Sequence, residues 1–298
     1  MLVEIHMLKN YAPSNLNRDD TGAPKNCMFG GVQRGRISSQ CLKRTWRTSE
    51  YFQEEIGKEH LGIRTRCLPD LVLEKLSDSG FPEEYLNKIR RKLTGIGNSD
   101  GSENKKDDKT AQIVFYTPED ITAVAEKIRE KMELCASAKE VGNISVKELQ
   151  ADMKKGNARA ITLDMALFGR MVTSDAFADV EAAMQVAHAI STNRVILETD
   201  FFTAVDDQIA GSEETGSGMM GDVDYNSSCY YFYASLDLEK LRENLESAPE
   251  REELMKKVLP VLIETMAFSN PGGKQNRFAA HSLPSAVLIE CKEKKVAV

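Results

Sequence analysis

The sequence predicts an α+β fold, and three observations support this. Strand patterns lie near both ends of the chain, at residues 2–8 and 285–291. Helical patterns follow the first strand and precede the last, the second of them at residues 250–268. An aromatic-rich stretch from Cys229 to Leu236 predicts a further strand between them. The predicted elements follow the ferredoxin-like order, which RNA-recognition folds also use. This order is a strand, a helix, two or three strands, a helix and a last strand.

The first predicted strand alternates between apolar and polar side chains. Val3, Ile5 and Met7 lie on one face, whereas Glu4 and His6 lie on the other. This alternation is typical of a strand with one buried face. Because the chain begins with a strand pattern, we expect no signal peptide.

A glycine-dotted loop follows this strand and leads into a helix. Ser38 and Ser39 are good N-cap residues, and the helix is predicted to end near Gly57. Leu42 and Trp46 share its apolar face. The helix therefore has one buried side and one polar side.

Residues 58–160 change to short helical patterns separated by polar linkers. The clearest helix follows Thr117, with Pro118 at the first helical position and Asp120 three residues after the cap. Residues 98–109 contain almost no apolar side chain and predict a mobile loop. We therefore expect a helical insertion between two strands of the sheet.

Two stretches after the insertion alternate in hydrophobicity. Residues 161–168 predict a strand. Residues 180–190 are ambiguous, because their alanines favour a helix whereas their even-numbered apolar positions favour a strand, and we interpret them as a strand. Farther along, Pro260 is expected to kink the helix at 250–268.

Residues 195–225 are acidic and rich in glycine. They contain eight Asp and Glu residues and no Lys or Arg. Their glycine-rich run from Gly211 to Gly221 cannot pack as an element on its own. We interpret the segment as a protruding arm.

Positive charge is concentrated in residues 18–47. This window holds seven basic residues and two acids, a net charge of +5, although the whole chain carries −7. Such a cluster is a candidate anion-binding face. We place Lys43 and Arg44 in the first helical turn, where each cation opposes the helix dipole by about 0.3–1 kcal/mol. A phosphate on the free N–H groups and serine hydroxyls would reverse that effect. The alternative is an ordinary solvated helix face.

Composition argues against several other classes of protein. No apolar run approaches the ~20 residues of a membrane span, and we expect a cytoplasmic protein. The six cysteines form no CxxC pair and the four histidines are dispersed, so we expect reduced thiols, no metal site and no cofactor. His188 lies on an apolar alternation and is expected to be a satisfied core residue.

Several sequence blocks resemble one family. The first block is Asn17-Arg-Asp-Asp20, then Lys25, then Phe29-Gly-Gly31, then Arg34-x-Arg-Ile-Ser-Ser-Gln-x-Leu-Lys-Arg44. Later blocks are Ala166-Leu-Phe-Gly-Arg-Met171, Phe201-Phe-Thr-Ala-Val-Asp-Asp207, Tyr230-Tyr-Phe-Tyr233 and Gly273-Lys-Gln-Asn-Arg-Phe-Ala-Ala280. Together they resemble the CasC family, the repeated backbone subunit of the type I-E CRISPR Cascade complex.

The resemblance implies a hand-shaped subunit with a ferredoxin-like palm, a helical fingers insertion and a protruding thumb. The palm would comprise residues 1–57, 161–192 and 227–298, the fingers 58–160, and the thumb 193–226. Family members usually continue for some tens of residues beyond the last block, so part of the palm edge is expected to be reduced.

The resemblance also implies a non-catalytic role in antiviral defence. Copies would form a head-to-tail homo-oligomer along a CRISPR guide RNA, and each thumb would kink the guide. The bases between kinks would pair with a target DNA strand, so base pairing reads the sequence. CasA, CasB, CasD and CasE would be the further partners.

Site residues follow from the resemblance, position by position. Guide phosphates would contact Arg18, Lys25, Lys43 and Arg47, and neutral hydrogen bonds would come from Ser38 and Gln40. Backbone contacts are also expected from Lys274 and Arg277.

Apolar contacts with the guide are expected from three further residues. Met171 would wedge against bases near a kink, and its alternative role is core filler at the end of a strand. Phe202 and Val205 would be apolar contacts of the thumb, although Phe202 could equally anchor the thumb to the palm. The thumb acids would be repelled by the guide, so we expect them to face the basic surface of the next subunit, which reversing Glu213 and Glu214 to Lys would test.

Two other functions remain open from the sequence. Asp19 and Asp20 could bind Mg²⁺ in a metal-dependent ribonuclease backbone subunit, because related subunits of type III complexes cut RNA with a loop aspartate. The simpler interpretation is that the pair orders its loop through local hydrogen bonds. The other function is a single-strand RNA-binding module that acts alone and does not polymerise.

Overall fold

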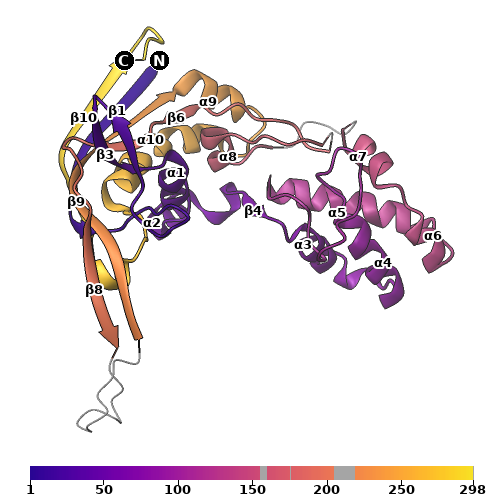
Figure 1. Cartoon of the computed structure of the whole chain (residues 1–298). Helices are drawn as coiled ribbons and strands as arrows, with labels where there is room; N and C mark the ends of the chain where they lie inside the picture. Colours follow the sequence, from indigo (N-terminus) through magenta and orange to yellow (C-terminus); the bar gives the residue numbers. More distant parts are fainter. Residues whose placement is uncertain (155–159, 175, 205–218, 298) are drawn as a thin grey trace, which may run out of the picture. The chain divides into compact units, whose positions relative to one another are not determined.

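Two compact units make up the computed structural model, which describes residues 1–154, 160–174, 176–204 and 219–297 (Figure 1). The first unit comprises residues 1–55, 185–237 and 258–298. The second unit comprises residues 56–184 and 238–257. The chain therefore leaves the first unit and returns to it twice.

The first unit is built on an antiparallel sheet. Its strand order is β10 (Pro284–Lys292), β1 (Leu2–Ser14), β9 (Met219–Asp237), β7 (Ala189–Ser191), β3 (Val32–Ile37) and β2 (Asn26–Phe29). Two further strands, β6 (Met184–Val186) and β8 (Glu198–Ala204), also pair with β9. In the centre, Ile5 of β1 lies opposite Ile289 of β10 and Ala234 of β9. The predicted first, aromatic-rich and last strands are confirmed, whereas the predicted strand at 180–190 is present as two short pieces, β6 and β7.

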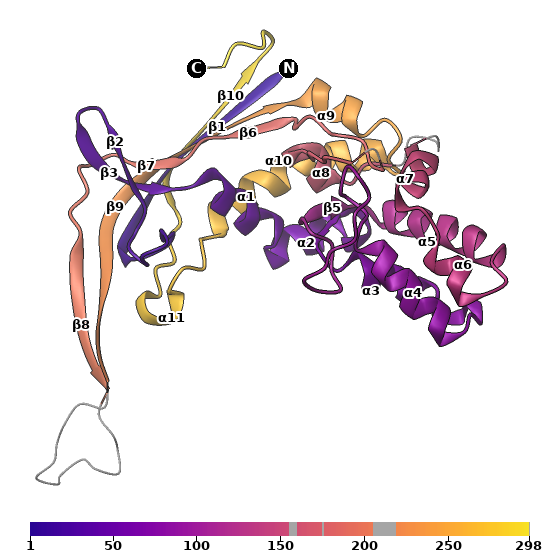
Figure 2. The ribbon, with the colours of Figure 1, turned by 45° about the vertical axis from the view of Figure 1, so that its right-hand side comes forward.

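Strand β9 is long enough to pair with β1 in the sheet and with β8 in a hairpin. Its C-terminal part pairs with β1, whereas its first residues pair with β8, from Glu198 opposite Tyr225 to Ala204 opposite Met219. Figures 1 and 2 both show β8 and this part of β9 as a two-stranded hairpin that leaves the sheet. The hairpin lies where the acidic arm was predicted.

Helices cover one face of this sheet. Val3, Ile5 and Met7 of β1 are buried, and α1 (Ser39–Arg47), α2 (Glu50–Ile56) and the C-terminal part of α10 (Arg251–Phe268) lie on the same side of the sheet (Figure 2). A short helix, α11 (Gln275–Phe278), precedes β10.

The single helix predicted from Ser39 to Gly57 is wrong, because it is two helices. Thr48 ends α1, and its hydroxyl donates to the Arg44 C=O at 2.8 Å. The Ser49 hydroxyl then accepts from the Phe52 N–H at 3.2 Å and caps α2. Side chains that bond to the local backbone compete with helix continuation in this way.

The second unit is mainly helical. Its helices are α3 (Leu68–Lys75), α4 (Glu83–Leu93), α5 (Pro118–Glu133), α6 (Ala138–Gly142), α7 (Val146–Lys154), α8 (Leu163–Phe168) and α9 (Leu238–Asn244), with 3₁₀ turns at Lys58–His60 and Ser77–Ser79. Strands β4 (Ile63–Thr65) and β5 (Val114–Tyr116) form a separate two-stranded sheet. Apolar residues from α3 to α7 share one buried core.

The predicted start of α5 is confirmed in detail. Thr117 accepts from the Asp120 N–H at 2.9 Å, and the Asp120 carboxylate accepts from the Thr117 N–H at 3.0 Å. This reciprocal capping box satisfies two backbone donors at the helix end. The polar loop at 98–109 is irregular, and an ion pair of 2.9 Å between Asp107 and Arg66 ties it to the unit.

The strand predicted at 161–168 is wrong, because residues 163–168 form helix α8. Leu163, Met165, Ala166 and Leu167 are all buried. A short helix buried on every side loses the apolar–polar period that distinguishes a helix from a strand. No helix in the described residues has the length and apolarity needed to cross a bilayer.

Candidate nucleic-acid interface

Asn17 joins the basic loop to the start of α1. Its C=O accepts from the Lys25 N–H at 2.8 Å, and its side-chain oxygen accepts from the Ser38 N–H at 2.9 Å. The Lys25 C=O accepts from the Arg36 N–H at 2.8 Å. Arg18, which follows Asn17 and is exposed, forms a β-bridge with Pro24. These bonds gather Arg18, Lys25 and Ser38 in one neighbourhood.

Asp19 orders this loop. One oxygen of its carboxylate accepts from the Thr21 N–H at 2.9 Å, the Thr21 hydroxyl at 2.7 Å and the Ala23 N–H at 3.1 Å. The Thr21 hydroxyl is the main cause of a lowered pKa of Asp19, because hydrogen bonds to a carboxylate favour its charged form. The local ordering role expected for Asp19 is therefore present.

The first turn of α1 is more fully bonded than the sequence suggested. Ser38, only 6% exposed, accepts from the Cys41 N–H at 3.3 Å, and His188 Nδ1 accepts from the Ser39 N–H at 3.3 Å. The first three backbone N–H groups of α1 belong to Ser39, Gln40 and Cys41. Within the described residues, only that of Gln40 lacks an acceptor. The expected phosphate site on several free N–H groups is therefore reduced to the exposed Gln40.

Helix α1 buries Leu42 and Trp46 and carries the cations Lys43, Arg44 and Arg47 on its remaining surface. Lys43 and Arg47 are one turn apart and partly exposed. Burial lowers the pKa of Lys43, so an anion beside it would stabilise the charged amine. Because α1 has only nine residues, Arg44 lies in its last turn, where a cation is favourable. The prediction that Arg44 opposes the dipole in the first turn is wrong.

His188 and Arg36 adjoin this face, and sequence reasoning missed both. His188 is exposed, so its predicted core position is wrong. An Arg36 Nη1 lies 3.4 Å from His188 Nδ1. Desolvation, then Arg36 and Lys25, lower the pKa of His188. The signal was available in the basic Arg34-x-Arg36 motif, whereas the contact with His188 depends on pairing of β3 with β7.

Residues 273–277 reach the same loop from the far end of the sequence. A Cβ on Gly273 would lie 2.3 Å from the Leu16 C=O oxygen and 2.6 Å from that of Asn15, so only glycine permits this approach. Lys274 follows directly, with a positive φ of 48°. The fold therefore places Lys274 beside the loop that carries Arg18.

Phe202 of β8, which is paired with Gly221 of β9, lies against Arg277. The Arg277 guanidinium is 4.3 Å from the centroid of the Phe202 ring, a cation–π contact. The ring also lies over Gly221 of β9, where an added Cβ would be 2.7 Å from Phe202 Cζ. Phe202 therefore anchors the hairpin to residue 277, which was one of its two expected roles. Val205, Glu213 and Glu214 lie outside the described residues.

Residues 3–297 match the model of a single protein family, described as CT1975-like protein. This match spans almost the entire sequence. The chain belongs to the CT1975-like family.

Chains in several solved structures are similar to this chain, among them two from CRISPR complexes. One belongs to a CRISPR RNA-guided surveillance complex, pre-nicking; it is 27% identical with a TM-score of 0.78, over 100% of this chain and 80% of that one. Another belongs to a CRISPR RNA-guided surveillance complex; it is 23% identical with a TM-score of 0.55, over 100% and 72% of the two chains, and supports the fold alone. No curated protein sequence matches. The resemblance to the CasC backbone family is confirmed.

Met171 of this CT1975-like protein lies in the second unit and is 90% exposed, so its role as core filler is wrong. Its neighbour Arg170 is buried and donates to the Asp120 carboxylate at 2.6 Å and the Ala178 C=O at 2.9 Å. Arg170 thereby fixes the backbone from which Met171 projects into solvent.

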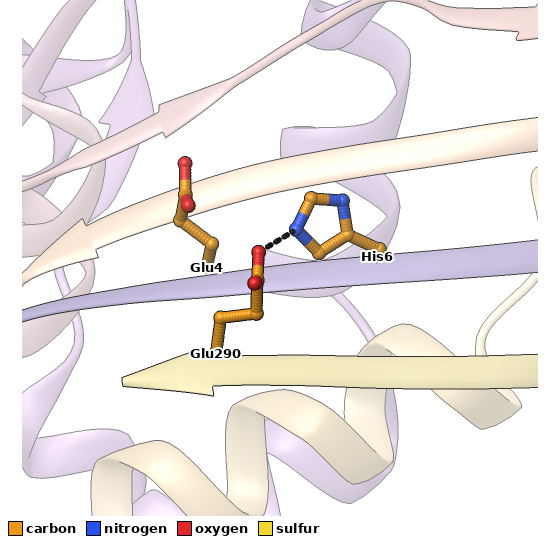
Figure 3. Close-up of side chains that lie close together, drawn as sticks. All are labelled: Glu4, His6 and Glu290. Carbon is orange, nitrogen blue, oxygen red and sulfur yellow. Dashed lines mark ion pairs between the residues drawn. The ribbon is translucent and has the colours of Figure 1, made fainter. Parts of the chain in front are cut away.

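A separate polar cluster lies on strands β1 and β10 of the CT1975-like chain (Figure 3). Glu4, His6 and Glu290 have ligand atoms within 4.8 Å of one another, and His6 Nε2 lies 3.3 Å from Glu290. The Lys292 ammonium pairs with Glu4 and lies 3.9 Å from Glu290, and the Tyr233 hydroxyl donates to Glu4. A metal ion would have to displace this ammonium, so the cluster fits a structural ion-pair network better than a metal site.

Proposed function

We propose that this protein is the guide-RNA-binding backbone subunit of a CRISPR RNA-guided surveillance complex. The observation that carries the proposal is the assembly of one cationic face from distant blocks. Asn17 joins the basic loop to α1, and Gly273 brings Lys274 against that loop. The similar chain from the pre-nicking surveillance complex supports the same assignment. Clustered cations suit a protein that holds a ribose-phosphate backbone.

The sheet topology supports a ferredoxin-like palm for the first unit. Taking β6 and β7 as one second strand, the chain runs β1, helix, β7, β9, helix, β10, and the spatial order is β10-β1-β9-β7. This is the strand order 4-1-3-2 of a ferredoxin-like sheet, with antiparallel neighbours. A sheet of this topology supports RNA-binding surfaces in other folds.

The finer assignment is a type I-E Cascade subunit in the cytoplasm. Guide phosphates would contact Arg18, Lys25, Lys43 and Arg47, with Ser38 positioning the helix start and Gln40 donating its N–H. Copies would assemble head to tail, leaving guide bases to pair with target DNA. CasA, CasB, CasD and CasE would complete the complex.

Sedimentation of the purified chain with and without a CRISPR transcript tests assembly. We expect a monomer alone and a series of larger particles on the transcript. An RNA-binding module that acts alone would give a single bound copy. Absence of binding would contradict the proposal itself.

A non-catalytic role is part of the proposal, because Asp19 already supports three local hydrogen bonds. The ribonuclease alternative is tested by incubating assembled particles with labelled complementary RNA and DNA in Mg²⁺. We expect intact strands. Specific cuts that disappear in the variants Asp19→Ala or Asp20→Ala would establish the alternative.

A further inference from the structure

His188 lies between β6 and β7, beside the start of α1. Its Nδ1 is 3.3 Å from the Ser39 N–H nitrogen and 3.4 Å from an Arg36 guanidinium nitrogen. Both neighbours are donors, and neither can accept a hydrogen bond. Nδ1 must therefore offer a lone pair, so the imidazole is neutral and carries its proton on Nε2.

The charges around the imidazole are cationic. Arg36 on β3 and Lys25 before β2 both lower the pKa of His188, in addition to the larger effect of desolvation. Within the described residues, no carboxylate is among the groups that shift it. Cys41 on α1 does not supply a negative charge, because burial raises the pKa of its thiol. Arg36 and Lys25 thus present positive charge beside a neutral imidazole.

We propose that His188 is a proton-linked member of the guide-binding face: it is neutral in the free protein and becomes protonated when a phosphodiester of single-stranded RNA lies beside Lys25 and Arg36. This inference rests on the proposed function and adds a residue and a pH dependence to it.

The exchange of partners follows from hydrogen-bond chemistry. Phosphate oxygens are strong acceptors, and they can replace Nδ1 as the partner of the Arg36 guanidinium and the Ser39 N–H. The imidazole then loses its two donors and gains a neighbouring negative charge. Both changes favour the protonated form, which can itself donate to the phosphate.

Binding should therefore take up one proton in the pH range where free His188 is neutral. Linkage then requires affinity to fall as pH rises, because deprotonated protein must acquire a proton to form the complex. One linked proton gives at most about a tenfold loss of affinity per pH unit.

The test uses the full chain and a synthetic oligouridylate, whose base does not titrate between pH 5.5 and 8. Affinity is measured across that range at constant ionic strength for the unmodified protein, His188→Gln and His281→Gln. His281 is an exposed histidine of the same unit and serves as the matched control. Calorimetry in buffers of different ionisation enthalpy counts the protons taken up by the unmodified protein.

We expect affinity to weaken with rising pH in the unmodified protein and in His281→Gln, and a flatter profile in His188→Gln. Proton uptake near one at neutral pH should fall toward zero in His188→Gln. Binding that is independent of pH, or a slope that persists in His188→Gln, would overturn the inference and leave the proposed function intact. Failure of the unmodified protein to bind RNA would instead contradict the proposed function.

Discussion

Lys9 is a cation in the core of the first unit, with 0% of its surface exposed. Its ammonium donates to the Ser269 C=O at 3.3 Å, just beyond α10, and lies 5.6 Å from the Phe232 ring centroid. A helix C-terminus favours a positive charge, but burial disfavours it more and lowers the pKa of Lys9 to about 8. The residue is therefore charged at neutral pH at a cost to stability.

The variant Lys9→Met should be more stable than the unmodified protein at pH 7, by about 1–3 kcal/mol, because an apolar chain of similar length replaces a buried charge. The folded-state pKa lies below the unfolded value of about 10.5, so the unfolded chain binds more protons between these values. The stability of the unmodified protein relative to Lys9→Met should therefore rise from pH 8 to 10.5, while the tyrosines with raised pKa affect both proteins equally. Urea unfolding across this range measures both effects.

Lys256→Met is the control, because Lys256 is exposed on α10. It should leave the pH dependence unchanged. A stability difference between the unmodified protein and Lys9→Met that is the same at pH 8 and pH 10.5 would show that Lys9 is not held as described.

For individual residues, the sequence predicted which residue types lie in the candidate site better than it predicted their contacts. The basic residues of the first block do gather around one loop, as their spacing indicated. His188 was misplaced, because its alternation with apolar neighbours resembles a buried strand while its ring points to α1. The partners of Asn17 were also hidden, since they lie on a loop, a strand and a helix start that only the fold brings together.

At the scale of elements, the turn at residues 273–277 depends on the close approach of Gly273 to the backbone of Asn15 and Leu16. In Gly273→Ala the new Cβ would meet backbone oxygens of Asn15 and Leu16, which cannot rotate away. We expect a loss of about 1–3 kcal/mol in stability and weaker RNA binding, because the basic loop must shift. Thermal unfolding and an RNA titration measure these effects.

Gly272→Ala provides a matched control one residue away, because a Cβ there meets nothing within 4 Å. It should change stability by less than about 0.5 kcal/mol. Equal effects of the two substitutions would contradict the packing of this turn against the loop.

The start of α5 is joined to the segment before Met171 by one buried ion pair. Asp120→Ala should cost about 3–5 kcal/mol, because it leaves Arg170 as an uncompensated buried charge and also removes the capping box. Urea unfolding measures the loss, and hydrogen exchange should localise it to α5 and residues near 170. Glu126→Ala on the exposed face of α5 should have little effect, and a comparable loss there would contradict the role of the pair.

Elements with strong local signals were predictable. The cap at Thr117 needs only neighbouring residues, and the strand at 2–8 has a clear alternation. By contrast, α8 has buried neighbours on all sides, and the break between α1 and α2 is made by two side-chain hydrogen bonds that a helical pattern does not encode.

Over the whole molecule, blocks far apart in sequence build one candidate RNA face. The first block supplies the loop and α1, the third supplies Phe202, and the last supplies Lys274 and Arg277. Family resemblance indicated that these blocks act together, whereas composition alone showed only a local excess of positive charge. Met171 belongs to the second unit, whereas these blocks belong to the first.

The most direct test of the guide-binding face neutralises its four cations together. Arg18, Lys25, Lys43 and Arg47 are changed to Gln, and transcript affinity is measured against salt concentration. The control neutralises four exposed cations of the second unit, Lys88, Arg91, Lys256 and Lys257. We expect the first variant to bind roughly a thousandfold more weakly, from about 1 kcal/mol per cation, and its salt slope to fall by about 0.7 for each phosphate that is no longer neutralised. Unchanged affinity and slope in that variant, or an equal loss of affinity in the control, would contradict the account.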